Sequence, residues 1–495
     1  MTTFFDNLFT RYPVKTRRFL ELLPGAFSWT LILFPIWGSL LIPYVLAYFI
    51  LFFDVYWFYK SFSLAITAYI ASKKIKAAEK QDWLKLAKEN KNFSKVTHVI
   101  IIPNYTESAA KLRETIKTIA DQTFPRKQIY VVLAMEEREA NGKEKAEILI
   151  KEFKNTFGRI FAAYHPDIPG EVKGKSSNEN YAARTAYKDL VEKEIIDINY
   201  ATISSVDADS LFDKQYFACL SYKFLNDSLR YNKFWQSANV FYSNIWKVPA
   251  PTRIISFFGS LWRTAVLLHG DRLISNSTYS LSFLMLKNID FWDVDVIPED
   301  YRIFFKAFYM LKGKAWAEPI FLQTSMDAPL SAGYIKSLKN KYQQEQRWSW
   351  GVSDDPLFIK WWLTVPNVPF IRKTIILYNV LIDHFLWPVN WFIITIAANI
   401  MPFINPVFSR TTLGYNLPKL AGVILTSCIF ALLAMIIVDF RNRPSQTSRV
   451  KQFLFPLEFI LLPVVGFFLS TLPALISHTK LMLGKRMEYK VTEKV

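Results

Sequence analysis

Residues 200–210, YATISSVDADS, place two aspartates directly after an apolar run typical of a buried strand. The strand is predicted over 200–206, and Asp207 and Asp209 follow it with only Ala208 between them. Upstream, strand-like runs alternate with helical patterns: strands over 96–103, 128–134 and 159–165, and helices over 108–122, 143–157 and 178–192. This alternation indicates βαβ units and a mostly parallel sheet, in which ligands bind beyond the carboxyl ends of the strands.

The chemistry of the aspartate pair indicates a metal. The turn after the first predicted strand, IPNYTES at 102–108, contains no glycine, so the dinucleotide fingerprint GxGxxG is absent, and the chain has no GxxxxGK[ST] loop either. Carboxylates suit Mg²⁺ or Mn²⁺ that bridges to a diphosphate, and alternation along an extended segment lets the second carboxylate reach another part of the ligand. The alternative is a solvated turn without a ligand.

Apolar residues gather near both ends of the 495-residue chain. The block at 27–72 is long enough for two membrane-spanning helices, broken near Pro43, and too long for the core of a signal peptide. Three more blocks lie at 374–403, 417–439 and 453–476. Basic residues flank the blocks, as expected for cytoplasmic loops, and this explains the net charge of +18 better than a nucleic-acid partner does.

The pattern predicts six segments: a cytoplasmic start (1–26), two transmembrane helices (27–72), a cytoplasmic α/β domain (93–325), interfacial helices (326–370), a C-terminal transmembrane region (371–480) and a cytoplasmic tail (481–495). A single crossing by the last apolar block would put the basic tail outside, in conflict with its charge. Pro463 and Pro473 would instead allow a re-entrant pair that returns the tail to the cytoplasm. The two cysteines, Cys219 and Cys428, have no zinc-site spacing.

A second acidic cluster, DVDVIPED at 293–300, precedes a helix-like run. Glu299 and Asp300 would favour the start of a helix through its dipole alone. The functional alternative is a general base that deprotonates a hydroxyl group.

A third element, KNKYQQEQRWSWG at 339–351, mixes basic and aromatic residues before the C-terminal apolar blocks. It is typical of an amphipathic helix at a membrane surface. Gln344, Arg347 and Trp348 share one helical face, where the arginine would hold phosphate oxygens and the indole would stack on a sugar ring.

Taken in order, these three elements resemble the D-x-D, [T]-E-D and Q-x-x-R-W motifs of the membrane-integrated family-2 glycosyltransferases, which include cellulose, chitin and hyaluronan synthases. The motifs here are Asp207-Ala-Asp209, Pro298-Glu299-Asp300 and Gln344 to Trp348. The tail YKVTEK at 489–494 resembles the F-x-V-T-x-K gating loop of cellulose synthases. The resemblance covers about residues 30–495. It departs from the family at Pro298, which replaces threonine, and at Tyr489, which replaces phenylalanine.

The resemblance implies an α/β glycosyltransferase-A-type (nucleotide-diphospho-sugar transferase) domain inserted between transmembrane helices. It also implies site roles: Asp209 and Asp207 for a Mg²⁺ or Mn²⁺ ion, Asp207 also for the nucleotide end of the donor, Asp300 as the catalytic base with Glu299 as a second catalytic residue, and Gln344, Arg347 and Trp348 for diphosphate and acceptor. The further candidates are Glu107, Glu137, Lys175, Asn178 and Asn180 for the donor, Gln236 for the acceptor, and Tyr489, Val491, Thr492 and Lys494 for gating.

The implied activity is an inverting transfer from a nucleotide sugar, a UDP-sugar by the resemblance, to a glycan at the cytoplasmic face of a membrane. Repeated extension of a polysaccharide and single transfer to a lipid acceptor both stay open. The alternative from another class is a membrane transporter or scaffold without catalysis, for which Asp383 and His384, beside an apolar block, are the supporting residues.

Overall fold

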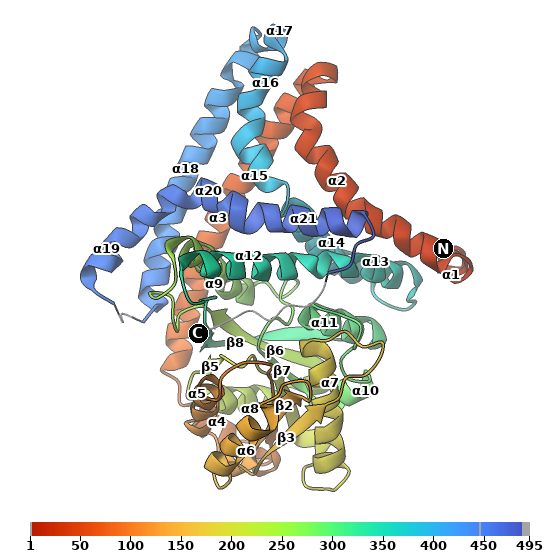
Figure 1. Ribbon diagram of the computed structural model, residues 1–495, viewed down its shortest axis with the longest axis vertical. Coiled ribbons are helices and arrows are strands. Elements are labelled where there is room, and N and C mark those ends of the chain that lie inside the picture. The colour runs from red at the N-terminus through yellow and green to blue at the C-terminus, as the bar shows by residue number, and fades with distance from the viewer. Residues whose placement is uncertain (1, 445–446, 488–495) are drawn as a thin grey trace.

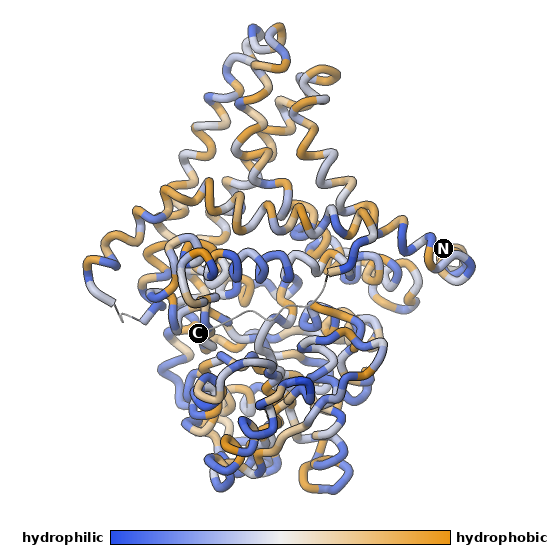
Figure 2. Tube along the Cα trace, in the orientation of Figure 1, coloured by the Kyte–Doolittle hydropathy of each residue, from blue (hydrophilic) through white to orange (hydrophobic). Residues whose placement is uncertain are grey.

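The computed structural model describes residues 2–444 and 447–487, and they form three layers (Figure 1). A group of apolar helices forms one end, an α/β domain forms the other, and helices that run crosswise, α12 (Tyr334–Ser349) and α21 (Leu472–Met482), lie between them. Figure 2 shows the apolar end mostly in orange and the α/β domain in mixed colours. The α/β domain is therefore separated from the apolar end by a helical layer.

The α/β domain contains an eight-stranded sheet in the order β3-β2-β1-β4-β7-β6-β8-β5. Its first half is parallel, as predicted, and consists of β1 (Thr97–Pro103), β2 (Ile129–Glu136), β3 (Arg159–His165) and β4 (Ala201–Ser205). The second half is mixed: β7 (Tyr279–Ser282) is antiparallel to both of its neighbours, β4 and β6 (Lys233–Val240). Short β5 (Leu211–Phe212) is antiparallel to β8 (Trp316–Ser325), which is parallel to β6. The strand–helix alternation that predicted parallel pairing stops after β4.

Two hydrophobic cores cover the two faces of the sheet. In β1, Val99 and Ile101 pack into one core, and Ile100 and Ile102 into the other, because successive side chains of a strand point to opposite faces. The first core includes α7 (Lys175–Ala186) and α11 (Glu299–Met310). The second includes α5 (Ala109–Ala120), α6 (Gly142–Phe153) and α8 (Tyr216–Asn226). Helices thus cover both faces and leave the strand ends for a ligand.

The apolar end is built mainly from α2 (Pro13–Leu41), α3 (Pro43–Glu79) and α18 (Thr412–Asn442), with the shorter α15 (Asn390–Phe392) and α16 (Ala398–Ile404) between them. The predicted break near Pro43 coincides with the junction of α2 and α3. In the described residues, four helices are long and apolar enough to cross a membrane, and a fifth span arises if α14 (Phe370–Leu386) and Asn390–Ile404, bent by 57°, form one.

The last apolar block, Arg449–Met482, meets the length and hydropathy criteria for a span but runs across the bundle rather than along α18 (Figure 1). Its end, α21, packs between α2 and α12. A side chain at Gly25 of α2 would collide with Met482, so glycine permits the close approach of these helices. Ser28 Oγ lies 3.1 Å from His478 Nδ1, and Ser477 Oγ donates to the Gln346 carbonyl oxygen at 3.0 Å. The block therefore ends beside the α/β domain.

Candidate active site

A cleft of about 140 Å³ opens at the carboxyl ends of β1, β2 and β4. All three sequence motifs contribute to its wall. The residues that line it are Pro103, Asn104, Tyr105, Glu107, Glu136, Lys175, Asn178, Asp207, Ala208, Asp209, Ser277, Ile297, Pro298, Glu299, Asp300, Arg347 and Trp348. Segments more than a hundred residues apart in the chain thus share one cavity.

A half-buried lysine lies at the centre of the acidic wall. Lys175 Nζ lies 2.8 Å from Asp207 Oδ1, 2.8 Å from Glu299 Oε1 and 3.7 Å from Glu179 Oε1. Burial opposes its charge, but the carboxylates of Asp207, Glu299 and Glu179 raise the pKa of Lys175 well above its usual value. Lys175 therefore stays charged and holds the first aspartate of the pair against the second acidic motif.

Two carboxyl groups of this cluster titrate near neutral pH. Burial raises the pKa of Glu299 to about 7, against the opposing attraction of Lys175. Burial likewise raises the pKa of Glu179, which accepts from Ser205 Oγ at 2.6 Å, to about 8. Three carboxylates around one ammonium group cannot all be charged without cost, so protons are retained at neutral pH.

Asp300 is fixed at the start of α11 by backbone donors. Its Oδ2 accepts from the Ser277 N–H at 2.9 Å and its Oδ1 from the Tyr301 N–H at 2.9 Å. Ser277 has a φ of 53°, which is unfavourable for a residue other than glycine. Such strain is typical of positions that orient a functional group.

Gln236 lies behind this loop and does not line the cleft, in contrast to the predicted contact with the acceptor. It is fully buried in β6, where its Oε1 accepts from the Asn276 N–H at 2.8 Å and its Nε2 donates to the Thr278 carbonyl oxygen at 3.1 Å. Its amide group is used to hold the loop that presents Ser277 to Asp300.

The second aspartate of the pair is held from the opposite side. Asp209 is buried, and its Oδ2 accepts from the Asp327 N–H at 2.7 Å. In the described residues, no group of three or more histidine, cysteine, aspartate or glutamate side chains has the arrangement of a metal site. Two carboxylates fit a divalent cation only if a ligand such as a diphosphate supplies further oxygens, as Mg²⁺ sites in nucleotide-binding proteins do.

The far end of the cleft is aromatic and was not recognised from the sequence. The guanidinium group of Arg138 lies 4.1 Å from the centre of the Tyr105 ring and pairs with Glu136. Thr106 has a φ of 74°, and Glu107 Oε2 accepts from the Tyr105 N–H at 2.6 Å. The turn presents the Tyr105 ring to the cleft, where it can stack on a flat ring. The sequence signal that could have predicted this aromatic surface is Tyr105 itself, in the turn after the first strand.

On the second strand, the acidic residue at the cleft is Glu136, while the predicted Glu137 is exposed and lies outside the lining. Alternation of side chains at the end of β2 explains this one-residue difference. On α7, Asn178 lines the cleft and donates to the Ala134 carbonyl oxygen at 2.8 Å. Asn180 points away from the cleft and donates to the Trp292 carbonyl oxygen.

Helix α12 supplies the third motif, and its prediction as a membrane-surface helix stays a prediction. Its Lys341, with no exposed surface, lies 2.7 Å from Glu345 Oε1 and donates to Gln344 Oε1 at 2.9 Å. Arg347 and Trp348 line the cleft, whereas Gln344 is buried beside Lys341 and does not. Lys336 and Lys339, in the first half of α12, are exposed, whereas Lys341 is buried. The helix therefore has both an exposed basic part and a buried part.

Two other predictions concern regions outside the cleft. Asp383 pairs with Arg272 at 2.6 Å and His384 with Asp355 at 2.7 Å, so both residues that supported a transporter are in ion pairs. The gating residues Tyr489, Val491, Thr492 and Lys494 lie outside the described residues. The last described residue, Met487, packs in a cluster with Ile297, which lines the cleft.

A scan against protein-family models and a search of curated proteins returned no match. Among solved structures, the chain is similar to the mannosyltransferase PcManGT from Pyrobaculum calidifontis in complex with GDP-Man and Mn²⁺, with 14% identity over 86% of this chain and 100% of that one and a TM-score of 0.43. It is also similar to residues 1–349 of TarS from S. aureus in complex with UDP, with 12% identity over 80% and 94% and a TM-score of 0.37. At such scores the likeness does not establish a shared fold.

Proposed function

We propose that the chain is an inverting, metal-assisted family-2 glycosyltransferase that moves a sugar from a nucleotide-sugar donor to a glycan or lipid-linked acceptor. The observation that carries this proposal is the meeting of Asp207, Asp209, Asp300, Arg347 and Trp348 in one cleft at the strand ends. A strand-end aspartate pair, a fixed carboxylate and an arginine–indole pair are what transfer from a sugar diphosphate requires. A UDP-sugar is the donor that the motif resemblance favours.

The donor would lie across the cleft, its flat base at Tyr105 and its diphosphate toward Asp207, Asp209 and Arg347. Arg347 and Lys175 supply positive charge near a leaving diphosphate. A Mg²⁺ or Mn²⁺ ion held by Asp207 and Asp209 would neutralise further charge there when bound.

Asp300 would accept the proton of an acceptor hydroxyl group. Its two backbone hydrogen bonds fix the carboxylate, and the acceptor would stack on Trp348 beside it. The acceptor oxygen then forms a bond to the anomeric carbon while the bond to the diphosphate breaks on the opposite face, so the configuration inverts. Glu299 is paired with Lys175 and would hold this lysine in place rather than act on the acceptor.

We place the reaction at the cytoplasmic face, where nucleotide sugars are available and where the basic flanks of the apolar helices are retained. Membranes that contain the protein should release free nucleotide from one member of a panel of nucleotide sugars, with a rate that depends on Mn²⁺ or Mg²⁺. Gel sizing of the labelled product then separates repeated extension from single transfer. Absence of release from every donor would refute the proposal.

A further inference from the structure

Helix α9 (Ala250–Ala265) carries two equally buried arginines that differ in their hydrogen bonds. Arg253 and Arg263 are each 9% exposed. Each guanidinium nitrogen of Arg253 has a hydrogen-bond acceptor. Its Nε donates to the Ile245 carbonyl oxygen at 3.1 Å, its Nη1 to Glu458 Oε1 at 2.6 Å and its Nη2 to the Val248 carbonyl oxygen at 2.7 Å. The Nε and Nη1 of Arg263 are buried without a hydrogen-bond partner in the part of the chain that the structure describes.

A buried guanidinium group without hydrogen-bond partners lowers the stability of the fold. An arginine does not lose its proton in proteins, so the buried guanidinium group remains a cation, and a buried cation without hydrogen bonds destabilises the fold. Native proteins leave few buried donors unsatisfied, and the exceptions call for an explanation. One explanation is a ligand whose oxygens accept hydrogen bonds from Arg263.

Arg263 does not line the cleft itself but lies next to Trp348, on which the proposed acceptor would stack. Its guanidinium carbon is 4.7 Å from the centre of the Phe241 ring and 5.2 Å from that of Trp348, which lines the cleft. Burial lowers the pKa of Arg263, and attraction from Asp300 and Glu345 counters the shift, so both acids lie within electrostatic reach. Glu345 already pairs with Lys341. A cation with unused donors thus stands beside the indole and near the proposed base.

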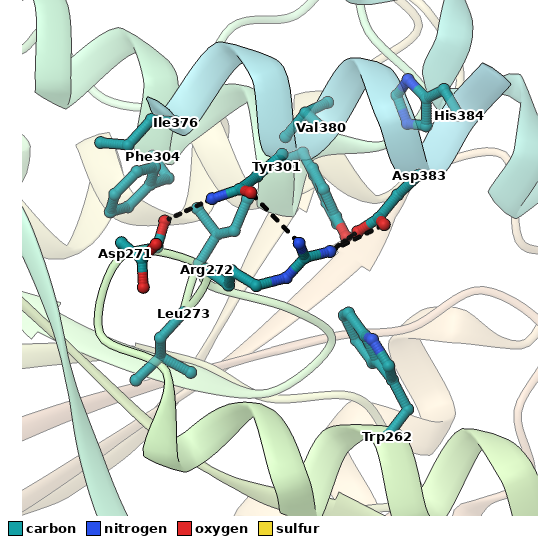
Figure 3. A pocket seen from close by; sticks show the side chains of 12 residues that line it. Trp262, Asp271, Arg272, Leu273, Tyr301, Phe304, Ile376, Val380, Asp383 and His384 are labelled. Carbon is teal, nitrogen blue, oxygen red and sulfur yellow. Dashed lines mark hydrogen bonds and ion pairs between the residues drawn. The ribbon is translucent and has the colours of Figure 1, made fainter. Parts of the chain in front are cut away.

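A second, smaller cavity of about 30 Å³ is lined by residues of α9, α11 and α14 (Figure 3). It is lined by Trp262, the neighbour of Arg263, and by Tyr301, the neighbour of Asp300. The first turn of α11 therefore faces both cavities, and α9 reaches the second one through Trp262. Figure 3 shows Arg272 and Asp383 paired across this second cavity.

The lining of the second cavity is amphipathic. Phe304, Ile376 and Val380 form its apolar part, and Asp271, Arg272, Asn379 and Asp383 its polar part. Two of the apolar residues belong to α14, which exposes Ile371, Ile375 and Tyr378 and is half of the bent helix pair apolar enough to cross a membrane. This cavity thus borders the membrane end of the molecule, which favours an amphiphile over a soluble acidic glycan.

We propose that Arg263 binds the phosphate of a lipid-linked sugar acceptor and thereby positions the sugar hydroxyl group at Asp300. This inference rests on the proposed glycosyl transfer. The lipid approaches from the side of α14, its phosphate receives the Nε and Nη1 donors, and its sugar stacks on Trp348. The hydroxyl proton passes to Asp300, the oxygen bonds to the anomeric carbon of the donor sugar, and the nucleoside diphosphate leaves.

The test compares an isoprenyl-phosphate-linked sugar with an alkyl glycoside of the same sugar. In the wild type we expect the phosphate-linked acceptor to have the higher kcat/KM. In Arg263→Gln the ratio of the two kcat/KM values should fall by about 10- to 100-fold, the usual worth of hydrogen bonds to a charged group, mainly through KM. Arg263→Lys keeps the charge and should retain part of the preference.

Arg253→Gln is the matched control, with the same substitution at equal burial on the same helix. It should lower the melting temperature and leave the acceptor ratio unchanged. A ratio unchanged in Arg263→Gln overturns the inference. A wild type that prefers a soluble uronate oligosaccharide to the phosphate-linked lipid also overturns it, because the acidic acceptor is then a glycan.

Direct binding separates this inference from the proposed function. Calorimetry in detergent without donor should show binding of a short isoprenyl phosphate, weaker binding of the matching isoprenol, and loss of that difference in Arg263→Gln. Binding that shows this difference, with no nucleotide release from any donor, would reject the glycosyltransferase and keep the phosphate site. Equal binding of the phosphate and the alcohol to the wild type rejects the site.

Discussion

The two ends of the cleft treat buried positive charge in opposite ways. At the donor end, Lys175 is surrounded by Asp207, Glu299 and Glu179, and every charge has a nearby counter-charge. At the acceptor end, Arg263 has the aromatic rings of Phe241 and Trp348 beside it and unused donors. The donor end is thus organised before a ligand arrives, whereas the acceptor end is incomplete without one.

The difference shows at which end of the cleft the protein balances the positive charge with its own carboxylates. In the proposed function, a nucleotide sugar brings a diphosphate that needs cations, so the donor end would hold Lys175 and Arg347 ready without repelling a metal. Its carboxylates satisfy both demands. At the acceptor end, in the proposed binding mode, the balancing negative charge would come with the substrate, and a protein carboxylate there would compete with it.

The largest effect is expected at the boundary between the two ends. Asp300→Asn should lower sugar transfer by about 10³-fold or more, since it removes the proton acceptor, and should leave nucleotide binding nearly unchanged. Transfer is measured by labelled-product formation and binding by calorimetry. Asp82→Asn, which changes the exposed residue that caps α4 (Trp83–Lys88) outside the cleft, is the control. Normal turnover by Asp300→Asn would assign the base elsewhere.

The next effect tests the donor end. Asp209→Asn retains an oxygen that accepts from the Asp327 N–H but removes the charge, so the fold should persist. We expect transfer to fall by about 100-fold and the Mn²⁺ concentration for half-maximal rate to rise. Chelation of divalent ions should reduce the wild type to the level of the variant. A variant with the metal response of the wild type would show that Asp209 has only a structural role.

A smaller effect distinguishes two adjacent glutamates. Glu136→Gln breaks the pair with Arg138, which lies over Tyr105, and should raise the donor KM by about 10-fold. Glu137→Gln changes the exposed neighbour and should leave the donor KM as it is. Initial rates at varied donor concentration provide the measurement. The reverse order of effects would place the nucleotide on the other side of β2.

The smallest effect concerns stability against pH. Glu179 and Glu299 have usual pKa values of 4.5 that burial raises to about 8 and 7, so the folded state binds more protons than the unfolded state in that window. Stability therefore falls as pH rises from about 4.5 to 8 and levels off above it. Glu179→Gln removes one of these groups, and its melting temperature at pH 8 should exceed that of the wild type by about 3 °C or more.

The control for this prediction is Glu192→Gln, which changes an exposed glutamate after the π-helical turn Tyr187–Val191 that continues α7. It should leave the melting curve unchanged at every pH. Parallel pH profiles for the wild type and Glu179→Gln would show that the extra proton resides on another group of the lysine cluster.

The donor half of the molecule follows closely from the sequence. Apolar runs and helical spacing predict β1 to β4, and parallel pairing brings their carboxyl ends to one edge, so Glu107, Asn178 and Asp207 meet without further information. The antiparallel second half of the sheet has no such alternation. Its order depends on packing between residues that are distant in the chain.

The acceptor half could not be predicted from local patterns. Helical spacing grouped Gln344 with Arg347 and Trp348, but burial beneath α21 turns Gln344 toward Lys341. Arg263 is one arginine among many in the sequence, and only its burial without partners distinguishes it from Arg253. Strand alternation, had it been applied to the end of β2, would have selected Glu136 over Glu137.

The crosswise helix α21 also bears on how the molecule is assembled during synthesis. It packs on α2 at Gly25 and on α12 through Ser477, yet it leaves the ribosome after every other described helix. The α/β domain emerges earlier and can fold around its own sheet. In a nascent chain, the half of the cleft at the strand ends would therefore form before α21 has been synthesised. The complete cleft of the proposed enzyme would form only after this last described helix has packed on α12.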